Sequence, residues 1–132
     1  MAFSALLGQS TARLTLERAV DADRVHHAYR FIGPEGVGKE FAARLLAQAL
    51  VCPHGKKACG QCSSCKRALE DSEREPFVPS HPDIILVGRQ VYPASSIGGK
   101  SEATGISVEQ IRRIVLPRVG FSPHEGQALC II

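Results

Sequence analysis

The sequence predicts an α/β fold with a parallel sheet, and three observations support this class. Short apolar runs that are typical of buried strands alternate along the chain with longer segments of helical periodicity. A glycine-rich loop joins the first of these runs to the helix that follows it. The run IILVG at 84–88 is apolar throughout, as expected for a central strand whose two faces are both covered.

The first half of the chain contains three expected helices and one expected strand. A helix is predicted over 10–21, with Ser10 or Thr11 as its N-cap and apolar residues every three to four positions. The apolar–aromatic run YRFI at 29–32 is expected to be a strand. The helix over 39–51 consists of strong helix formers and ends before a proline. A shorter helix is expected near 65–73.

The second half continues the alternation. The proline-rich segment PFVPSHPD at 76–83 is expected to link this short helix to the strand at 84–88. The Gly/Ser-rich range 89–105 has no periodicity and is expected to be a disordered loop. Ser107 and Gln110 have the spacing of a capping box, which predicts a helix that starts after Ser107. The run ALCII at 128–132 is expected to be the third strand.

The composition is that of one globular domain. The chain has 132 residues, of which 44% are hydrophobic and 22% are charged. No apolar run approaches the roughly 20 residues that span a bilayer, and the N-terminus lacks a secretion signal, so a cytoplasmic location is expected. The net charge of +3 argues against direct binding of nucleic acid. In this setting, five cysteines favour a metal site or catalysis over disulfides.

The stretch GPEGVGKE at 33–40 matches the phosphate-loop pattern G-x-x-x-x-G-K-[ST] except at its last position. Glycines let backbone N–H groups close on phosphate oxygens, and the following helix directs its positive end at the anion. A lysine at this position reaches the β- and γ-phosphates. The residues expected to bind a nucleotide phosphate are Gly33, Gly36, Gly38, Lys39 and Glu40.

Glu40 stands where the pattern requires a hydroxyl that binds Mg²⁺. A carboxylate there is longer and negatively charged, so it opposes the approach of a polyanion. The other interpretation is a solvated glutamate in the first turn of a helix, where the helix dipole favours a negative charge. The sequence therefore predicts a loop that binds ATP or ADP weakly or not at all and contains no catalytic residue.

The segment 52–65 contains four cysteines with the spacing C-x6-C-x2-C-x2-C. Four thiolates suit tetrahedral zinc and leave no coordination position open, so the predicted metal is structural. An iron–sulfur cluster is a weaker alternative, because the ferredoxin pattern requires a further cysteine near Leu69, and a thioredoxin-type pair would use only two of the four. His54 is an alternative ligand, and Cys130 is expected to be a small core residue. The predicted zinc ligands are Cys52, Cys59, Cys62 and Cys65.

A phosphate loop, a helix and a four-cysteine knuckle in this order resemble the nucleotide-binding domain of bacterial DNA polymerase III clamp-loader subunits, which are AAA+ P-loop NTPases. The resemblance is carried by HHAYRFIGPEGVGKE, LLAQALVC, CGQCSSC, SHPDIILV and ISVEQIRRI. It implies a parallel sheet with helices on both faces and a small inserted zinc module at 52–65. It also implies that Gly8 and Gln9 lie near the adenine.

Within this family, the HPD and VEQIR stretches and Glu40 resemble the delta-prime type more than the gamma/tau type. The resemblance implies a member of a hetero-oligomeric ring with gamma/tau and delta subunits, which loads the sliding clamp onto primed DNA. An ATP-hydrolysing gamma/tau type is the alternative. A separate zinc-ribbon module that binds nucleic acid is disfavoured by the small net charge.

The resemblance also places several family elements after the strand at 128–132. These are the acidic Walker B residues, the arginine that acts on a neighbouring subunit, the lid and the collar domain. Residues 1–132 are therefore expected to be the N-terminal part of an AAA+ nucleotide-binding domain.

Overall fold

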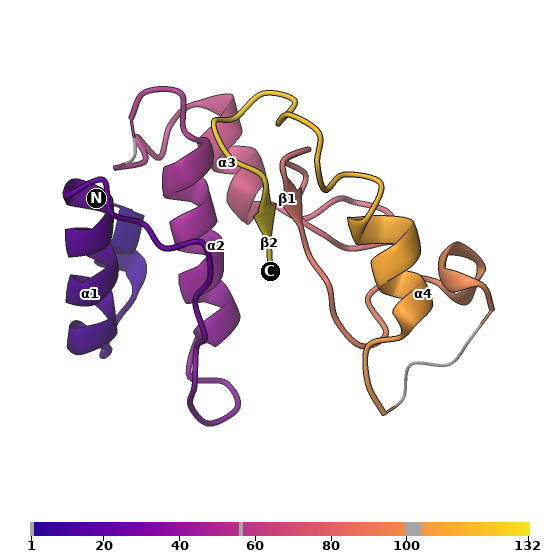
Figure 1. The fold of residues 1–132 in the computed structure, drawn as a ribbon. Helices are drawn as coiled ribbons and strands as arrows, with labels where there is room; N and C mark the ends of the chain where they lie inside the picture. Colours follow the sequence, from indigo (N-terminus) through magenta and orange to yellow (C-terminus); the bar gives the residue numbers. More distant parts are fainter. Residues whose placement is uncertain (1, 56, 100–103) are drawn as a thin grey trace.

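A computed structural model describes residues 2–55, 57–99 and 104–132. Two strands and several helices are formed by these residues (Figure 1), and α4 continues directly into a π-helical turn, η3. The elements in chain order are η1 (Ala2–Ala5), α1 (Ser10–Asp21), α2 (Lys39–Val51), α3 (Ser63–Leu69), β1 (Ile84–Ile85), η2 (Ala94–Ile97), α4 (Val108–Gln110), η3 (Ile111–Val115) and β2 (Cys130–Ile131).

The sheet is parallel, as predicted. Ile84 of β1 lies opposite Cys130 of β2, and Ile85 lies opposite Ile131. Helices α1, α2 and α3 lie to one side of this sheet and α4 lies to the other side (Figure 1). In the described part of the chain the sheet has two strands rather than the three that the sequence predicts.

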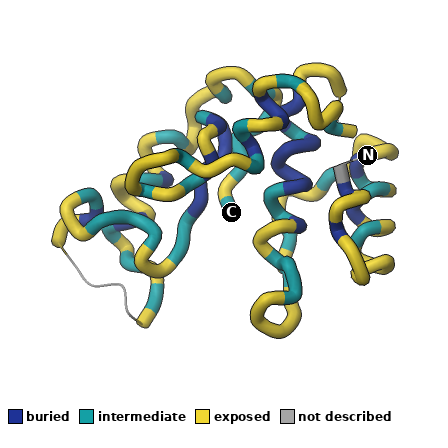
Figure 2. The backbone as a smooth tube through the Cα atoms, turned by 180° about the vertical axis from the view of Figure 1, so that it is seen from behind, coloured by how far each residue is buried: buried dark blue, intermediate teal, exposed yellow. Residues whose placement is uncertain are grey.

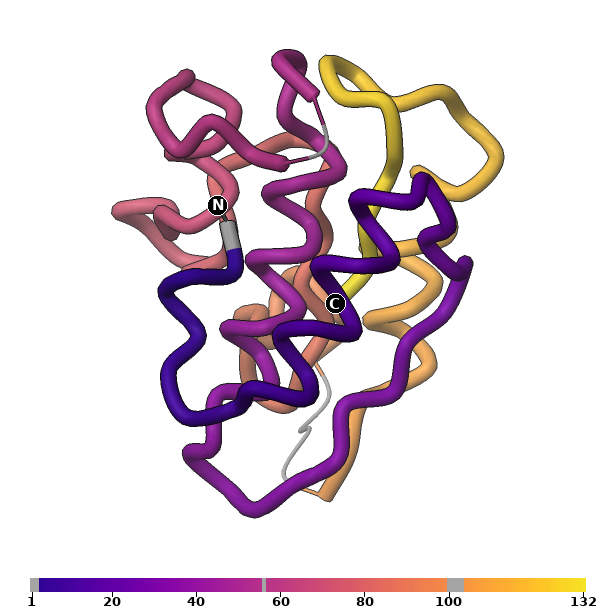
Figure 3. Tube along the Cα trace, turned by 90° about the vertical axis from the view of Figure 1, so that its left-hand side faces the viewer, coloured from indigo at the N-terminus to yellow at the C-terminus, as the bar shows by residue number. Residues whose placement is uncertain are grey.

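The strand expected over 29–32 is not formed. Tyr29 and Phe31 pack against the core while Arg30 and Ile32 are exposed, so the segment has the alternation of a strand. It lacks a strand neighbour, because a groove of about 600 Å³ separates it from residues 128–132. Both segments run in the same direction (Figure 3), and apolar side chains of α2 form part of the groove wall. Without a neighbouring strand, a short segment cannot form the hydrogen-bond ladder of a sheet.

The core has two parts, and α2 contributes to both. Leu45 of α2 packs with residues of η1 and α1, including Phe3 and Leu16, in the first cluster. Val51 of α2 packs with Ile84 of β1 in the second cluster. Figure 2 shows the resulting burial of α2 along much of its length. Helix α2 therefore joins the two parts of the core.

The start of α1 differs from the sequence prediction, whereas α4 starts after Ser107 as predicted. Gln9 is the N-cap of α1 and makes no capping hydrogen bond with its side chain, and Ser10 and Thr11 lie within the first turn of the helix. Ser107 does cap α4, because its hydroxyl accepts the Gln110 N–H. The Gln110 side chain, however, does not complete the capping box. It is fully buried and pairs with both backbone groups of Gly88, at 3.0 and 2.9 Å, as a neighbouring strand would.

The range 89–105 contains some ordered structure where it is described. Residues 94–97 form η2, and the Ile97 side chain is buried. The Tyr92 hydroxyl donates a hydrogen bond to the carbonyl of Leu86. Residues 100–103, for which the sequence also predicts disorder, lie outside the described residues. Among the described helices, none has both the length and the apolar character needed to cross a membrane.

Candidate phosphate loop and metal centre

Residues 33–38, the candidate phosphate loop, connect the extended segment 29–32 to α2. Gly36 and Gly38 have φ angles of 78° and 97°, and Gly38 is the N-cap of α2. These angles lie in the left-handed region of backbone conformation, which residues with a Cβ atom rarely adopt. A Cβ atom at Gly36 would meet nothing within 4 Å, so backbone conformation rather than space requires glycine there.

Lys39 folds back onto the candidate phosphate loop. Its Nζ donates hydrogen bonds to the carbonyl oxygens of Gly33, at 2.6 Å, and Pro34, at 2.8 Å. The ammonium group therefore already lies at the loop, and two backbone carbonyls hold it there. An incoming phosphate has to share or replace these carbonyls as partners of the lysine.

Glu40 belongs to a chain of ion pairs that leads away from the loop. One Arg44 nitrogen lies 2.8 Å from Glu40 Oε1, and another lies 2.6 Å from Asp71 Oδ1. Burial alone would lower the pKa of Arg44, but Asp71 and Glu40 together raise it. Neither sequence-based interpretation of Glu40 included this pairing. The carboxylate is bound along the side of α2 by an arginine one helical turn further on.

Gly8 and Gln9 lie in the connection between η1 and α1, and both are exposed. The Leu6 side chain just before them lies 3.8 Å from the position that a Cβ atom of Gly38 would take. This connection and the candidate phosphate loop lie at the same end of the molecule (Figures 1 and 3).

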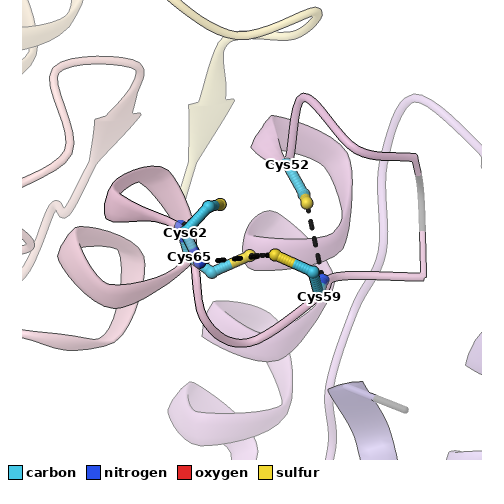
Figure 4. Close-up of side chains that lie close together, drawn as sticks. All are labelled: Cys52, Cys59, Cys62 and Cys65. Carbon is cyan, nitrogen blue, oxygen red and sulfur yellow. Dashed lines mark hydrogen bonds between the residues drawn. The ribbon is translucent and has the colours of Figure 1, made fainter.

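The four predicted cysteine ligands lie together. Their sulfur atoms are all within 4.8 Å of one another, and the Cys59 and Cys65 sulfurs are 3.9 Å apart (Figure 4). A zinc–sulfur bond of about 2.3 Å places two ligands of a tetrahedral site about 3.8 Å apart. Cys52 follows α2, Cys62 is the N-cap of α3, and Cys65 lies within α3. All four are free thiols, so the cluster offers a complete set of sulfur donors.

Backbone N–H groups point at the sulfur atoms of the cluster. The N–H of Cys59 donates to Cys52 Sγ at 3.5 Å, and those of Cys62 and Cys65 donate to the preceding cysteine sulfurs at 3.4 Å. Backbone N–H groups of Gln61 and Cys62 lower the pKa of the Cys59 thiol to about 6. Burial, by contrast, raises the pKa of the Cys65 thiol. Since a metal ion binds the thiolate, it would offset the penalty of deprotonating this buried sulfur.

The cluster and the candidate phosphate loop lie at opposite ends of α2. This helix has 13 residues, so it separates the two sites by about 20 Å. A metal ion held by the cysteines therefore does not contact a phosphate held by the loop. His54 is exposed and does not belong to the metal-ligand cluster found among the described residues. Cys130 lies partly buried in β2, and burial raises its pKa to about 11.

A buried Ser–His pair connects α3 to the start of β1, and sequence reasoning did not predict it. The Ser64 hydroxyl lies 2.7 Å from His81 Nε2. Since Nδ1 of His81 accepts the N–H of Asp83, the proton of this imidazole resides on Nε2 and points at Ser64. The serine hydroxyl in turn donates to the Val51 carbonyl. No base therefore faces this serine, and the arrangement is structural rather than nucleophilic.

Asp83 anchors the loop that precedes β2. Its carboxylate is fully buried and accepts the backbone N–H groups of His124, Glu125 and Gly126, while Arg118 forms an ion pair with it. Burial alone would raise the pKa of Asp83, but these three hydrogen bonds outweigh burial and lower it. The sequence HPD directly before the apolar run 84–88 could have revealed this anchor. An acid at the start of a buried strand is expected to be buried too, and buried acids are almost always paired.

A model of the protein family described as "DNA polymerase III, delta subunit" matches residues 8–132. The chain belongs to this family. This chain is 46% identical to DNA polymerase III subunit gamma/tau of Mycobacterium tuberculosis over 65 residues, which are 48% of this chain. It is 42% identical over 66 residues to subunit tau of Escherichia coli, and 40% identical over 78 residues, 57% of this chain, to the STICHEL-like 1 protein of Arabidopsis thaliana.

These comparisons confirm the expected relationship to DNA polymerase III clamp-loader subunits. The alignments cover 11% of the Mycobacterium tuberculosis protein, 10% of the Escherichia coli protein and 7% of the Arabidopsis protein. The chain therefore matches about a tenth of the length of these relatives.

Proposed function

We propose that this family member is the nucleotide-binding part of a delta-prime type clamp-loader subunit. In this role it joins gamma/tau and delta subunits in a ring that loads the sliding clamp onto primed DNA, and it contacts the clamp and the DNA indirectly. The observation that carries the proposal is the combination of an intact lysine, Lys39, with a glutamate at the next position that is bound to Arg44.

The chemistry of the loop supports a subunit that does not hydrolyse ATP. In the phosphate-loop pattern, the residue after the lysine supplies a neutral hydroxyl to Mg²⁺. Here that residue is Glu40, whose carboxylate is directed to an arginine. Without a positioned metal ion, the charge that develops on the γ-phosphate is not neutralised. Backbone N–H groups and Lys39 still provide for the binding of an anion, so weak binding of ATP or ADP is retained.

The cysteine cluster supports a structural zinc ion in the same domain. Four sulfur donors fill a tetrahedral site, which leaves no open position for water or substrate. The cluster joins the end of α2 to the start of α3. In this proposal the ion fixes the inserted segment 52–65 and takes no part in chemistry at the phosphate loop.

A gamma/tau type subunit that hydrolyses ATP is the second candidate. The identities of 46% and 42% to gamma/tau and tau subunits favour it. Phosphate release by the full-length protein with Mg²⁺ separates the two candidates. We expect no turnover above that of a Lys39→Ala control, whereas turnover that this substitution abolishes would favour the gamma/tau type.

Assembly tests the remaining part of the proposal. The full-length protein would be mixed with gamma/tau and delta subunits of the same organism and analysed by size-exclusion chromatography with light scattering. We expect one complex that contains all three subunits. A protein that stays separate from both subunits would overturn the proposed role in the ring.

A further inference from the structure

We propose that Arg44 is a positioning residue for the candidate phosphate loop, because it binds Glu40 and offsets part of its negative charge. The loop then accepts a phosphate anion even though a carboxylate occupies the position after its lysine. This inference rests on the proposed phosphate site at residues 33–39 and adds a residue that does not itself touch the loop.

Arg44 is held firmly enough for this role. Its side chain is only 12% exposed, compared with 59% for Glu40 and 43% for Asp71. Two of its nitrogens contact Glu40 Oε1, at 2.8 and 2.9 Å, and a third contacts Asp71 Oδ1 at 2.6 Å. The guanidinium group therefore bridges two carboxylates in a fixed direction.

The partner on the far side, Asp71, is itself fixed in place. It forms an isolated antiparallel bridge with Pro79, and the neighbouring residue Ser72 donates its N–H to the Val78 carbonyl. A small backbone hairpin that follows α3 thus supports the guanidinium group from the side opposite Glu40. We therefore expect Arg44 to keep its direction when the Glu40 carboxylate is replaced by a neutral amide.

The charge of Glu40 matters because of where it lies. It occupies the first turn of α2, next to Lys39 and close to the N–H groups that would bind an anion. An unpaired carboxylate there would repel phosphate and compete with it for the lysine. Paired with Arg44, the same carboxylate produces a weaker negative field at the loop than an unpaired one would. When a carboxylate and a bound anion lie a few ångströms apart near a protein surface, this difference between a paired and an unpaired carboxylate changes the affinity for the anion on the order of tenfold.

A double-mutant cycle on the full-length protein tests this inference. Binding of inorganic pyrophosphate without Mg²⁺ is measured by calorimetry for the wild type, Arg44→Met, Glu40→Gln and the double variant. We expect Arg44→Met to weaken binding on the order of tenfold in the wild-type background and less than twofold in the Glu40→Gln background. Arg44→Lys, which restores the charge, should recover most of the lost affinity.

Two controls separate this role from a structural one. Arg113→Met removes an arginine of η3 that pairs with Glu109 of α4, and α4 lies across the sheet from α2 (Figure 1). This substitution should change the affinity less than twofold. Thermal unfolding of each variant shows whether Arg44→Met still folds. If it does not, the comparison of Arg44→Lys with Arg44→Gln in the same titration replaces it, with an expected difference of several-fold.

Equal weakening by Arg44→Met in both backgrounds would overturn the inference, because loss of packing does not depend on the charge of residue 40. An unchanged affinity in the wild-type background would also overturn it. If neither the folded wild type nor Glu40→Gln binds pyrophosphate, the phosphate site itself is refuted, and this inference with it.

Discussion

The Ser64 hydroxyl and the His81 imidazole form a buried hydrogen bond of 2.7 Å that joins α3 to the residues before β1. This bond fixes the segment that contains the cysteine cluster to the edge of the sheet. The serine proton points at the Val51 carbonyl, so the bond contributes stability without activating a nucleophile.

Ser64→Ala should therefore destabilise the protein without removing any hydrolytic activity. The substitution leaves the Val51 carbonyl and the His81 N–H without a partner in a buried site, which costs about 1–3 kcal/mol. Urea unfolding of the purified protein measures this change. Ser63→Ala, one residue earlier and at the start of α3, is the matched control with an expected change below about 0.5 kcal/mol. Equal stability of Ser64→Ala and the wild type would contradict the structural role.

Acidification should destabilise the fold in two steps. Burial, and then the nearby Arg67, lower the pKa of His81, so its folded form favours the neutral ring. Its contribution to stability is complete above the unfolded pKa of about 6.5 and is lost as the pH falls below that value. Asp83 also has a lowered pKa, so its contribution is lost as the pH falls below about 3.9.

The first of these steps can be assigned to His81 by substitution. The free energy of unfolding would be measured in urea at pH 7.5, 5.5 and 3.5. His81→Asn should remove most of the change between pH 7.5 and 5.5, because an amide does not titrate there. The further loss down to pH 3.5 should remain in this variant. A variant that keeps the full loss between pH 7.5 and 5.5 would show that another group titrates.

The cysteine cluster should contain about one zinc ion per chain when the protein is purified without added metal. Elemental analysis tests this, and iron with visible absorbance, or a folded protein without metal, would contradict it. Cys62→Ser should reduce the zinc content and loosen the segment 52–65. Binding of pyrophosphate at the loop should change little, since α2 separates the two sites by about 20 Å.

Restoring the hydroxyl after the lysine should restore metal-dependent binding. Glu40→Thr supplies the side chain that the phosphate-loop pattern requires, and Arg44 keeps Asp71 as its partner. We expect Mg·ADP to bind the full-length variant several-fold more tightly than the wild type, as measured by calorimetry. Weaker binding of Mg·ADP would identify Glu40 itself as a ligand of the metal ion.

Local signals in the sequence were sufficient for some parts of this structure. Helix α2 has the predicted bounds, 39–51, because a glycine precedes a run of strong helix formers and a proline lies just beyond its end. The four cysteines were found by spacing, since adjacent ligands on one knuckle lie close together in any fold that forms it.

Contacts between distant residues could not be predicted in this way. Arg44 and Asp71 are 27 positions apart, and both are ordinary charged residues in the sequence. The pairing of Gln110 with Gly88 is similar, because the pattern around Ser107 indicated a local cap instead. The segment 29–32 has the composition of a strand, yet a strand also needs a neighbour, and composition does not supply one.

The parallel pairing of Ile84 with Cys130 has a consequence for how the chain folds during synthesis. The two residues are 46 positions apart, so at about 5–20 residues per second β1 is translated roughly 2 to 9 s before its partner. The contact between Gln48 and Cys65 spans only 17 positions. Helices α2 and α3 can therefore associate first. Until β2 has been translated, the apolar edge of β1 stays exposed on the nascent chain, where a chaperone or an incorrect strand can bind it.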